Sequence, residues 1–254
     1  MALRPAPYIL GLKAKVFRAG MINMENKIEA EFEIERMNVE EKGQKLLWCP
    51  FAEISKTEMP TKGKYKNLYP SGITVHFTAG RSMKGDRDSE NCLAYGKKQG
   101  YAYWCLSRDG TIFQSHSLDS WGYHAGKAHW GEFKSCSDKM LGLEINCAGK
   151  LTKKDGKYLS WFGEEYPESE VRFVKAKENM TEGYYHKYTE AQEKSLIELC
   201  IWLKSNNPNV FSFDNVAGHD EIAIPHGRKS DPGGSLSMTM PTFRNILKLK
   251  YDNL

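Results

Sequence analysis

A short stretch near the C-terminus concentrates side chains that could do chemistry. Residues 218–234 read GHDEIAIPHGRKSDPGG and place His219 and Asp231 on either side of Arg228 and Lys229. The stretch has almost none of the apolar spacing that forms a helix or a strand. A solvated surface loop would explain any one of these residues, so a functional interpretation needs support from elsewhere in the chain.

A histidine and a glutamate interrupt two apolar runs. His76 lies in TVHFT and Glu144 lies in LGLEIN. A histidine within a strand is either a hydrogen-bonded core imidazole or a ligand, and the residue alone leaves both open. An unpaired buried carboxylate is unfavourable enough that Glu144 is expected to have a partner or a function. Two histidines, an aspartate and a nearby glutamate match a catalytic zinc site, in which three protein ligands leave a fourth position for water.

The strands that must position these residues can be read from short apolar runs bounded by glycine and turn residues. GITVHFTAG at 72–80 and MLGLEINCAG at 140–149 each predict a buried strand. Residues 101–116 predict two strands around an Asp-Gly turn, which makes Asp109 a turn residue.

Two helices are predicted in the C-terminal third. The stretch 189–208 predicts a helix that Thr189 can cap and that ends before Pro208. Its residues Leu196, Leu199, Cys200 and Leu203 share one face. Residues 242–254 predict a C-terminal helix. Together, the predicted elements indicate an α/β fold with a mixed central β-sheet flanked by helices.

The N-terminal quarter has a different pattern. Residues 28–37, IEAEFEIERM, alternate apolar and charged side chains and predict a half-buried strand. A stretch rich in Lys, Gly and Pro at 56–72 predicts a linker. We therefore expect a small β-containing extension for targeting or docking at 1–60 and a catalytic domain at 61–254. The alternative is that the extension adds a strand to the edge of the catalytic sheet.

Composition limits the class of protein. The 254 residues are 40% hydrophobic, which is enough for a sizeable core. No apolar run approaches the ~20 residues of a membrane span, and the N-terminus lacks a signal region, so we expect a protein made in the cytoplasm. The net charge of +4 falls short of a nucleic-acid-binding stripe. The six cysteines form no CxxC pair, which favours reduced thiols over a zinc ribbon or a disulfide framework.

Six motifs occur in an order that resembles a known family. They are ITVHFTAG, LSRDGTIFQ, GYHAGKAHW, LGLEINCAG, YTEAQ and GHDEIAIPHGRKSDPGG, and they span roughly residues 70–250. The chain resembles the zinc-dependent N-acetylmuramoyl-L-alanine amidases of type 2, which include phage endolysins and bacterial recycling amidases. Animal peptidoglycan recognition proteins share that fold. Any one motif alone would be a weak signal.

The resemblance implies a role for each candidate residue. The implied ligands of Zn²⁺ are His76, His219 and Asp231, the implied catalytic residues are Glu144 and Lys229, and the implied substrate-binding residues are His124, Tyr123 and Trp130. It also implies hydrolysis of the amide between N-acetylmuramic acid and L-alanine in peptidoglycan or a muropeptide, by a phage endolysin or another lytic enzyme. The sequence does not determine the oligomeric state, and we expect a monomer.

The sequence also departs from the family pattern. Twelve positions separate the two loop ligands, more than the resemblance leads us to expect, so His226 is a competing ligand. The tyrosine that some relatives use is replaced by Ala102, which leaves more of the chemistry to Glu144. The long segment 150–187, rich in aromatic and charged residues, is expected to line the substrate groove.

Two other functions stay open at this point. A non-catalytic peptidoglycan-binding module would use the same fold without a complete ligand set. A delivered wall-degrading component of a phage particle or secretion machine would use residues 1–60 for docking.

Overall fold

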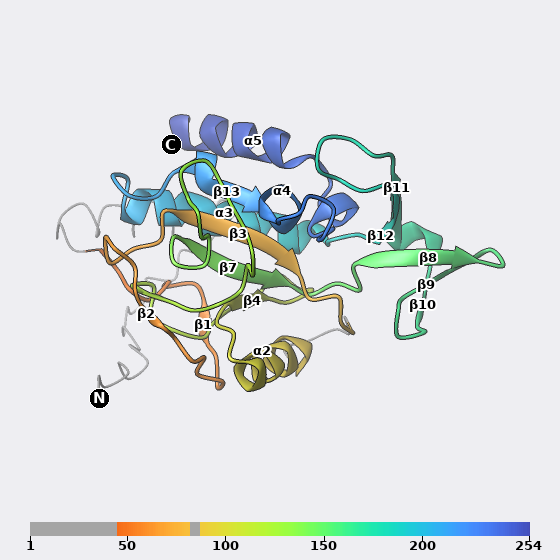
Figure 1. The fold of residues 1–254 in the computed structure, drawn as a ribbon, viewed down its shortest axis with the longest axis horizontal. Helices are drawn as coiled ribbons and strands as arrows, with labels where there is room; N and C mark the ends of the chain where they lie inside the picture. The colour runs from red at the N-terminus through yellow and green to blue at the C-terminus, as the bar shows by residue number, and fades with distance from the viewer. Residues whose placement is uncertain (1–44, 82–86) are drawn as a thin grey trace, which may run out of the picture.

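The fold is built on a six-stranded central sheet. The structure is a computed structural model, and it describes residues 45–81 and 87–254. The strand order is β1-β5-β4-β7-β3-β13, and the strands lie side by side in Figure 1. Their bounds are β1 Glu53–Ile54, β3 Gly72–Phe77, β4 Trp104–Leu106, β5 Ile112–Gln114, β7 Met140–Ile145 and β13 Val216–Gly218. All neighbours are parallel except β4 and β5, so the sheet is mixed, as predicted.

Strand β3 lies near the middle of the sheet and is buried on both faces. Ile73 and Val75 are fully buried and belong to the main hydrophobic core. The side chains of Thr74 and His76 alternate with them and therefore point to the opposite face. One face of the strand thus builds the core, and the other carries the polar residues.

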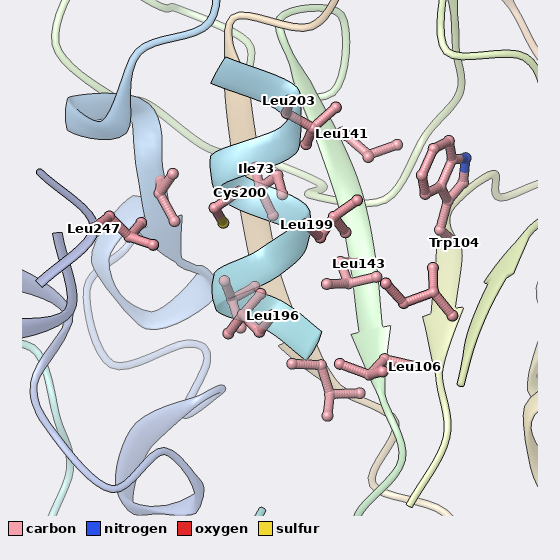
Figure 2. Packing of buried hydrophobic residues seen from close by; sticks show 14 of the residues in the cluster. Ile73, Trp104, Leu106, Leu141, Leu143, Leu196, Leu199, Cys200, Leu203 and Leu247 are labelled. Atoms are coloured by element: carbon pink, nitrogen blue, oxygen red, sulfur yellow. The ribbon is translucent and has the colours of Figure 1, made fainter. Parts of the chain in front are cut away.

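Helices cover both faces of the sheet. Helix α3, Glu190–Asn206, and helix α5, Met240–Asp252, lie on one face, and helix α2, Arg87–Gln99, lies on the other (Figure 1). Figure 2 shows leucines of α3 packed over β3 and β7, among them Leu199 and Leu203. Both predicted helices are confirmed, and Thr189 forms a capping box with Gln192 at the start of α3.

A second sheet projects from the C-terminal end of β7 (Figure 1). It contains β8 Lys150–Lys154, β9 Lys157–Leu159, β10 Glu165–Tyr166, β11 Val171–Val174 and β12 Gly183–His186, in the order β10-β9-β8-β12-β11. All of its strand pairs are antiparallel. The segment 150–187 therefore folds as an arm, and its expected role in lining the substrate groove stays a prediction.

Residues 45–72 pack against the domain. β1 pairs with β5 at the edge of the central sheet, and β2, Gly63–Lys64, pairs with β6, Ser120–Trp121. Met59, Tyr65 and Tyr69 are buried. The linker prediction for 56–72 is wrong, because the apolar residues between its lysines bury against the domain.

The expected extension at 1–60 is described by the structure only from residue 45 onward. The strand predicted at 28–37 lies outside the described residues, and the independence of the extension stays a prediction. Phe51 makes an edge-to-face contact with Trp202 of α3 at 6.0 Å between ring centroids. The described end of the expected extension therefore contacts the domain, and the division into 1–60 and 61–254 stays a prediction. Among the residues that the structure describes, no helix combines the length and apolar character needed to cross a membrane.

Candidate active site

The central strands bring the candidate residues to one place. His76 on β3 is the direct register partner of Glu144 on β7, and side chains paired in this way point to the same face of a sheet. His219 begins α4, His219–Ile222, immediately after β13, the strand on the other side of β3. The loop that follows returns Asp231, whose carbonyl oxygen accepts a hydrogen bond from the Asp220 amide at 2.7 Å.

Three buried side-chain atoms converge on one point. The Nδ1 atoms of His76 and His219 are 2.9 Å apart. Oδ2 of Asp231 lies 3.0 Å from the first of these nitrogens and 2.9 Å from the second. Among the described residues, these three form the one group of His, Cys, Asp or Glu whose geometry could hold a metal ion.

Backbone carbonyls fix which nitrogen of each histidine carries the proton. A carbonyl oxygen can only accept, so Nε2 of His219 donates to the Ala125 carbonyl at 3.0 Å. Nε2 of His124 likewise donates to the Met140 carbonyl at 3.0 Å, which leaves Nδ1 of His124 as an acceptor. Nε2 of His76 donates to that Nδ1 at 3.1 Å. Both histidines of the cluster therefore turn an unprotonated Nδ1 toward its centre.

This arrangement needs a cation. Two nitrogen lone pairs and a carboxylate oxygen within 3.0 Å of one another repel unless a proton or a metal ion lies among them. Burial and then the neighbouring His219 lower the pKa of His76 to about 4, which disfavours a proton there at neutral pH. Burial by itself would raise the pKa of Asp231, but its two histidine partners bring it below the usual value. The carboxylate is therefore ionised.

The spacing also suits zinc. Ligand atoms 2.0–2.1 Å from a tetrahedral Zn²⁺ stand about 3.3 Å apart. The observed separations of 2.9–3.0 Å are only a few tenths of an ångström shorter. The donor set of two imidazoles and one carboxylate is one that catalytic zinc sites use. The residues present therefore fit the metal.

Glu144 lies next to this cluster without a protein partner. Its Oε2 atom is buried and makes no hydrogen bond to any described residue. Burial, then Cys92 and Asp231, raise the pKa of Glu144 well above its usual value, and the positive charge of Lys229 opposes that rise. The charge of Lys229 also contributes, as the smallest of the causes, to the lowered pKa of His76. Glu144 thus lies beside the cluster, and the positive charge of Lys229 acts on both Glu144 and His76.

The three residues expected to bind substrate lie in different surroundings. His124 lies between His76 and the Met140 carbonyl, beneath the metal cluster. Tyr123 is 53% exposed and meets the Trp121 ring edge-to-face at 5.7 Å. Trp130 donates its Nε1 hydrogen to the Asp214 carbonyl at 3.0 Å, and the Arg244 guanidinium stacks on its ring. The substrate roles stay predictions, and the contacts of His124 give it a structural duty as well.

The remaining sequence candidates lie away from the cluster. His226 is exposed and is not part of the metal-binding group. Asp109 accepts a hydrogen bond from the Thr111 amide at 3.0 Å, as a turn residue does. Ala102 is buried and carries no polar side chain, while the hydroxyl of the adjacent Tyr103 donates to the Cys92 carbonyl at 2.9 Å.

Several supporting residues were not predicted from the sequence. The Tyr188 hydroxyl donates to the His76 carbonyl at 2.9 Å, and its position just before the helix cap Thr189 gave no sign of this. Tyr185 of β12 packs under the Asp-Pro-Gly-Gly turn, where a Cβ on Gly233 would come within 2.6 Å of its ring. The two glycines of that turn are therefore needed for close approach, which explains the end of the motif.

Comparison with known proteins agrees with this geometry. The model of the Amidase_2 family, described as N-acetylmuramoyl-L-alanine amidase, matches residues 66–234. The chain belongs to this family. Membership makes the chain an enzyme of the N-acetylmuramoyl-L-alanine amidase class. The resemblance inferred from the six motifs is therefore confirmed. No curated protein matches the amidase in sequence.

Solved structures agree with the fold. A selenomethionine derivative of AmpD has a TM-score of 0.51 at 21% identity, covering 80% of this chain and 98% of that one. AmpDh3 from Pseudomonas aeruginosa, in complex with an anhydromuramic pentapeptide, has a TM-score of 0.47 at 18% identity and covers 77% and 66%. AmiD from E. coli, in complex with anhydro-N-acetylmuramic acid-L-Ala-D-γ-Glu-L-Lys, has a TM-score of 0.45 at 20% identity and covers 72% and 57%. At these identities, the similarity of the first shows the amidase fold.

Proposed function

We propose that the amidase is a zinc-dependent peptidoglycan hydrolase that cleaves the amide bond between N-acetylmuramic acid and L-alanine. The observation that carries the proposal is the convergence of Nδ1 of His76, Nδ1 of His219 and Oδ2 of Asp231 beside the unpartnered Oε2 of Glu144. Family membership supplies the reaction class. The site fits a metal hydrolase because each of the three ligand positions carries a residue that can bind a metal. Glu144 is available beside them for proton transfer.

The protein side chains divide the work of hydrolysis. A bound zinc ion supplies Lewis acidity, which lowers the pKa of a water to ~7 and polarises the substrate carbonyl. Glu144, whose ionised form the positive charge of a bound zinc would favour, takes a proton from the attacking water as the new C–O bond forms. It then passes that proton to the nitrogen of L-alanine as the amide C–N bond breaks. Lys229 offers positive charge to the carbonyl oxygen while that oxygen is an anion. Proton transfer of this kind contributes typically ~10²–10⁴-fold to the rate.

Besides its predicted contact with substrate, His124 acts through His76. It accepts the Nε2 proton of His76 and is itself oriented by the Met140 carbonyl. This chain of hydrogen bonds holds His76 in the tautomer whose Nδ1 is free to bind metal. Such outer partners commonly affect metal affinity by ~10–100-fold.

The cellular role that we propose is that of a lytic enzyme, a phage endolysin or another wall-degrading hydrolase, which reaches the wall after release or delivery. A docking role for residues 1–60 would suit a delivered component of a phage particle or secretion machine. The rival function, a non-catalytic binding module, is disfavoured by the complete ligand set.

The test combines metal analysis with product analysis. The purified protein should hold about one equivalent of zinc, and His76→Ala should lose it. Mass spectrometry of digested peptidoglycan should show free stem peptides that begin with L-alanine and intact glycan strands. Zinc binding with no stem release would identify a binding module, and stem release with no bound metal would overturn the zinc mechanism.

A further inference from the structure

Trp161 is an exposed aromatic residue that the proposed chemistry does not use. It lies in the turn between β9 and β10, and 77% of its surface is exposed, more than for any other large hydrophobic residue in the described part of the chain. Burying a large apolar side chain stabilises a fold, so this exposure forgoes a substantial stabilisation. Tryptophan is also enriched among the residues that contribute most to binding at contact surfaces.

The indole is held in one orientation although it is exposed. Its Nε1 hydrogen is donated to the Ala79 carbonyl at 2.6 Å. Phe162 meets it edge-to-face at 5.4 Å with an interplanar angle of 88°. An ion pair between Arg81 and Glu164 at 3.2 Å joins the same two segments. These contacts fix the ring before a ligand arrives, which reduces the entropy lost on binding.

The same hydrogen bond places the indole close to the metal-binding cluster. Ala79 follows His76 by three residues, so their Cα atoms are at most about 11 Å apart. The intervening backbone is anchored, because the Thr78 amide donates to the Ile145 carbonyl at 3.1 Å and the Thr78 hydroxyl donates to the Cys147 carbonyl at 3.2 Å. The arm that carries Trp161 therefore borders the site within the reach of a short saccharide.

The chemistry of the surface selects a sugar ring. The indole N–H is already used, so the ring offers only its faces, which pack against the C–H face of a pyranose. A stem-peptide carboxylate would find no free donor on this ring and would meet the negative charge of Glu164. Arg81 is already paired with that glutamate.

We propose that Trp161 is a binding platform for a sugar of the glycan strand, next to the muramyl unit whose amide enters the site. The inference rests on the proposed function, since it deepens the substrate class from a muramyl peptide to a glycan-linked one. The turn between β9 and β10 of the arm then gives the enzyme a preference for polymeric or disaccharide-containing substrates.

The first experiment compares two soluble substrates, one with N-acetylglucosamine joined to the muramyl peptide and one with the muramyl peptide alone. Trp161→Ala should raise the apparent KM about tenfold for the disaccharide substrate, with kcat unchanged and with no change for the shorter substrate. The control is Leu249→Ala on α5, which removes a residue that is 63% exposed on the opposite face of the central sheet. It should leave both KM values unchanged.

The second experiment does not depend on catalysis. Peptide-free glycan strands should bind wild type and quench its tryptophan fluorescence, and Trp161→Ala should lose that binding. Equal KM values for wild type and Trp161→Ala on the disaccharide substrate, or equal losses on both substrates with a lower melting temperature, would overturn the platform. If wild type cleaves neither substrate, the proposed function fails instead, and the glycan-binding experiment still decides the role of Trp161.

Discussion

Gly142→Ala tests the link between His124 and the metal site without touching a polar group. Gly142 lies on β7 beneath the His124 ring, and a Cβ added there would come within 2.6 Å of Cγ and 2.9 Å of Cδ2 of that ring. Ordinary van der Waals contact begins near 3.4 Å, so the imidazole must move by most of an ångström. The glycine is in a regular strand, so the backbone accepts alanine.

The displaced ring should lose its two hydrogen bonds. They measure 3.1 Å to Nε2 of His76 and 3.0 Å to the Met140 carbonyl, and a contact of 3.6 Å or more is no longer a hydrogen bond. His76 is then free to adopt the other tautomer. We expect zinc affinity to fall about 10–100-fold, or roughly 1.4–2.8 kcal/mol, and the free energy of unfolding of the metal-free protein to fall by about 1–3 kcal/mol.

The assay is competition for zinc with a chromophoric chelator, followed at neutral pH. The control is the same substitution in a His124→Ala background, where the clash is absent. There Gly142→Ala should change zinc affinity by less than about 0.5 kcal/mol, as for independent sites. Two results would refute the argument that His124 orients His76. One is wild-type zinc affinity in Gly142→Ala; the other is a double variant that binds zinc about 10–100-fold more weakly than His124→Ala alone.

Three further predictions concern catalysis, pH and the N-terminal segment. Glu144→Gln should retain zinc but lose turnover by ~10² or more; stem release within threefold of wild type would remove Glu144 from the mechanism. His116 is buried, and burial lowers its pKa from 6.5 to about 4, so its contribution to stability is complete above pH 6.5 and is lost as the pH falls toward 4. Between pH 7 and pH 5, urea denaturation should show that His116→Gln loses about 2 kcal/mol less stability than wild type, and equal losses would contradict the assignment. A chain starting at residue 45 should melt like the full chain, whereas one starting at Lys64 should melt several degrees lower, since it lacks β1 and the buried Met59; equal melting of both would show that the packed segment adds no stability.

The sequence was informative wherever a residue type contradicts its surroundings. His76 and Glu144 were found because each interrupts an apolar strand, and the α3 cap and its buried face follow from local spacing. Ala125 and Met140 could not be found, because they act through backbone carbonyls that every residue possesses. The contact between Trp161 and Ala79 joins residues 82 positions apart, and nothing in either segment signals it. The burial of Met59, Tyr65 and Tyr69 was missed because lysines lie between these apolar positions.

The long sequence separation of the metal ligands makes the metal a sensor of the complete fold. His76 is 143 residues from His219 and 155 from Asp231, so an unfolded chain cannot bring the three donors together without closing loops of that size. Zinc bound as proposed would therefore favour the native state, and above the dissociation constant each tenfold increase in free zinc would add up to about 1.4 kcal/mol to stability. Removal of zinc by a chelator should therefore make the protein unfold at a lower temperature, so that the melting temperature follows the free zinc concentration. A zinc-poor environment should also make the protein easier to degrade.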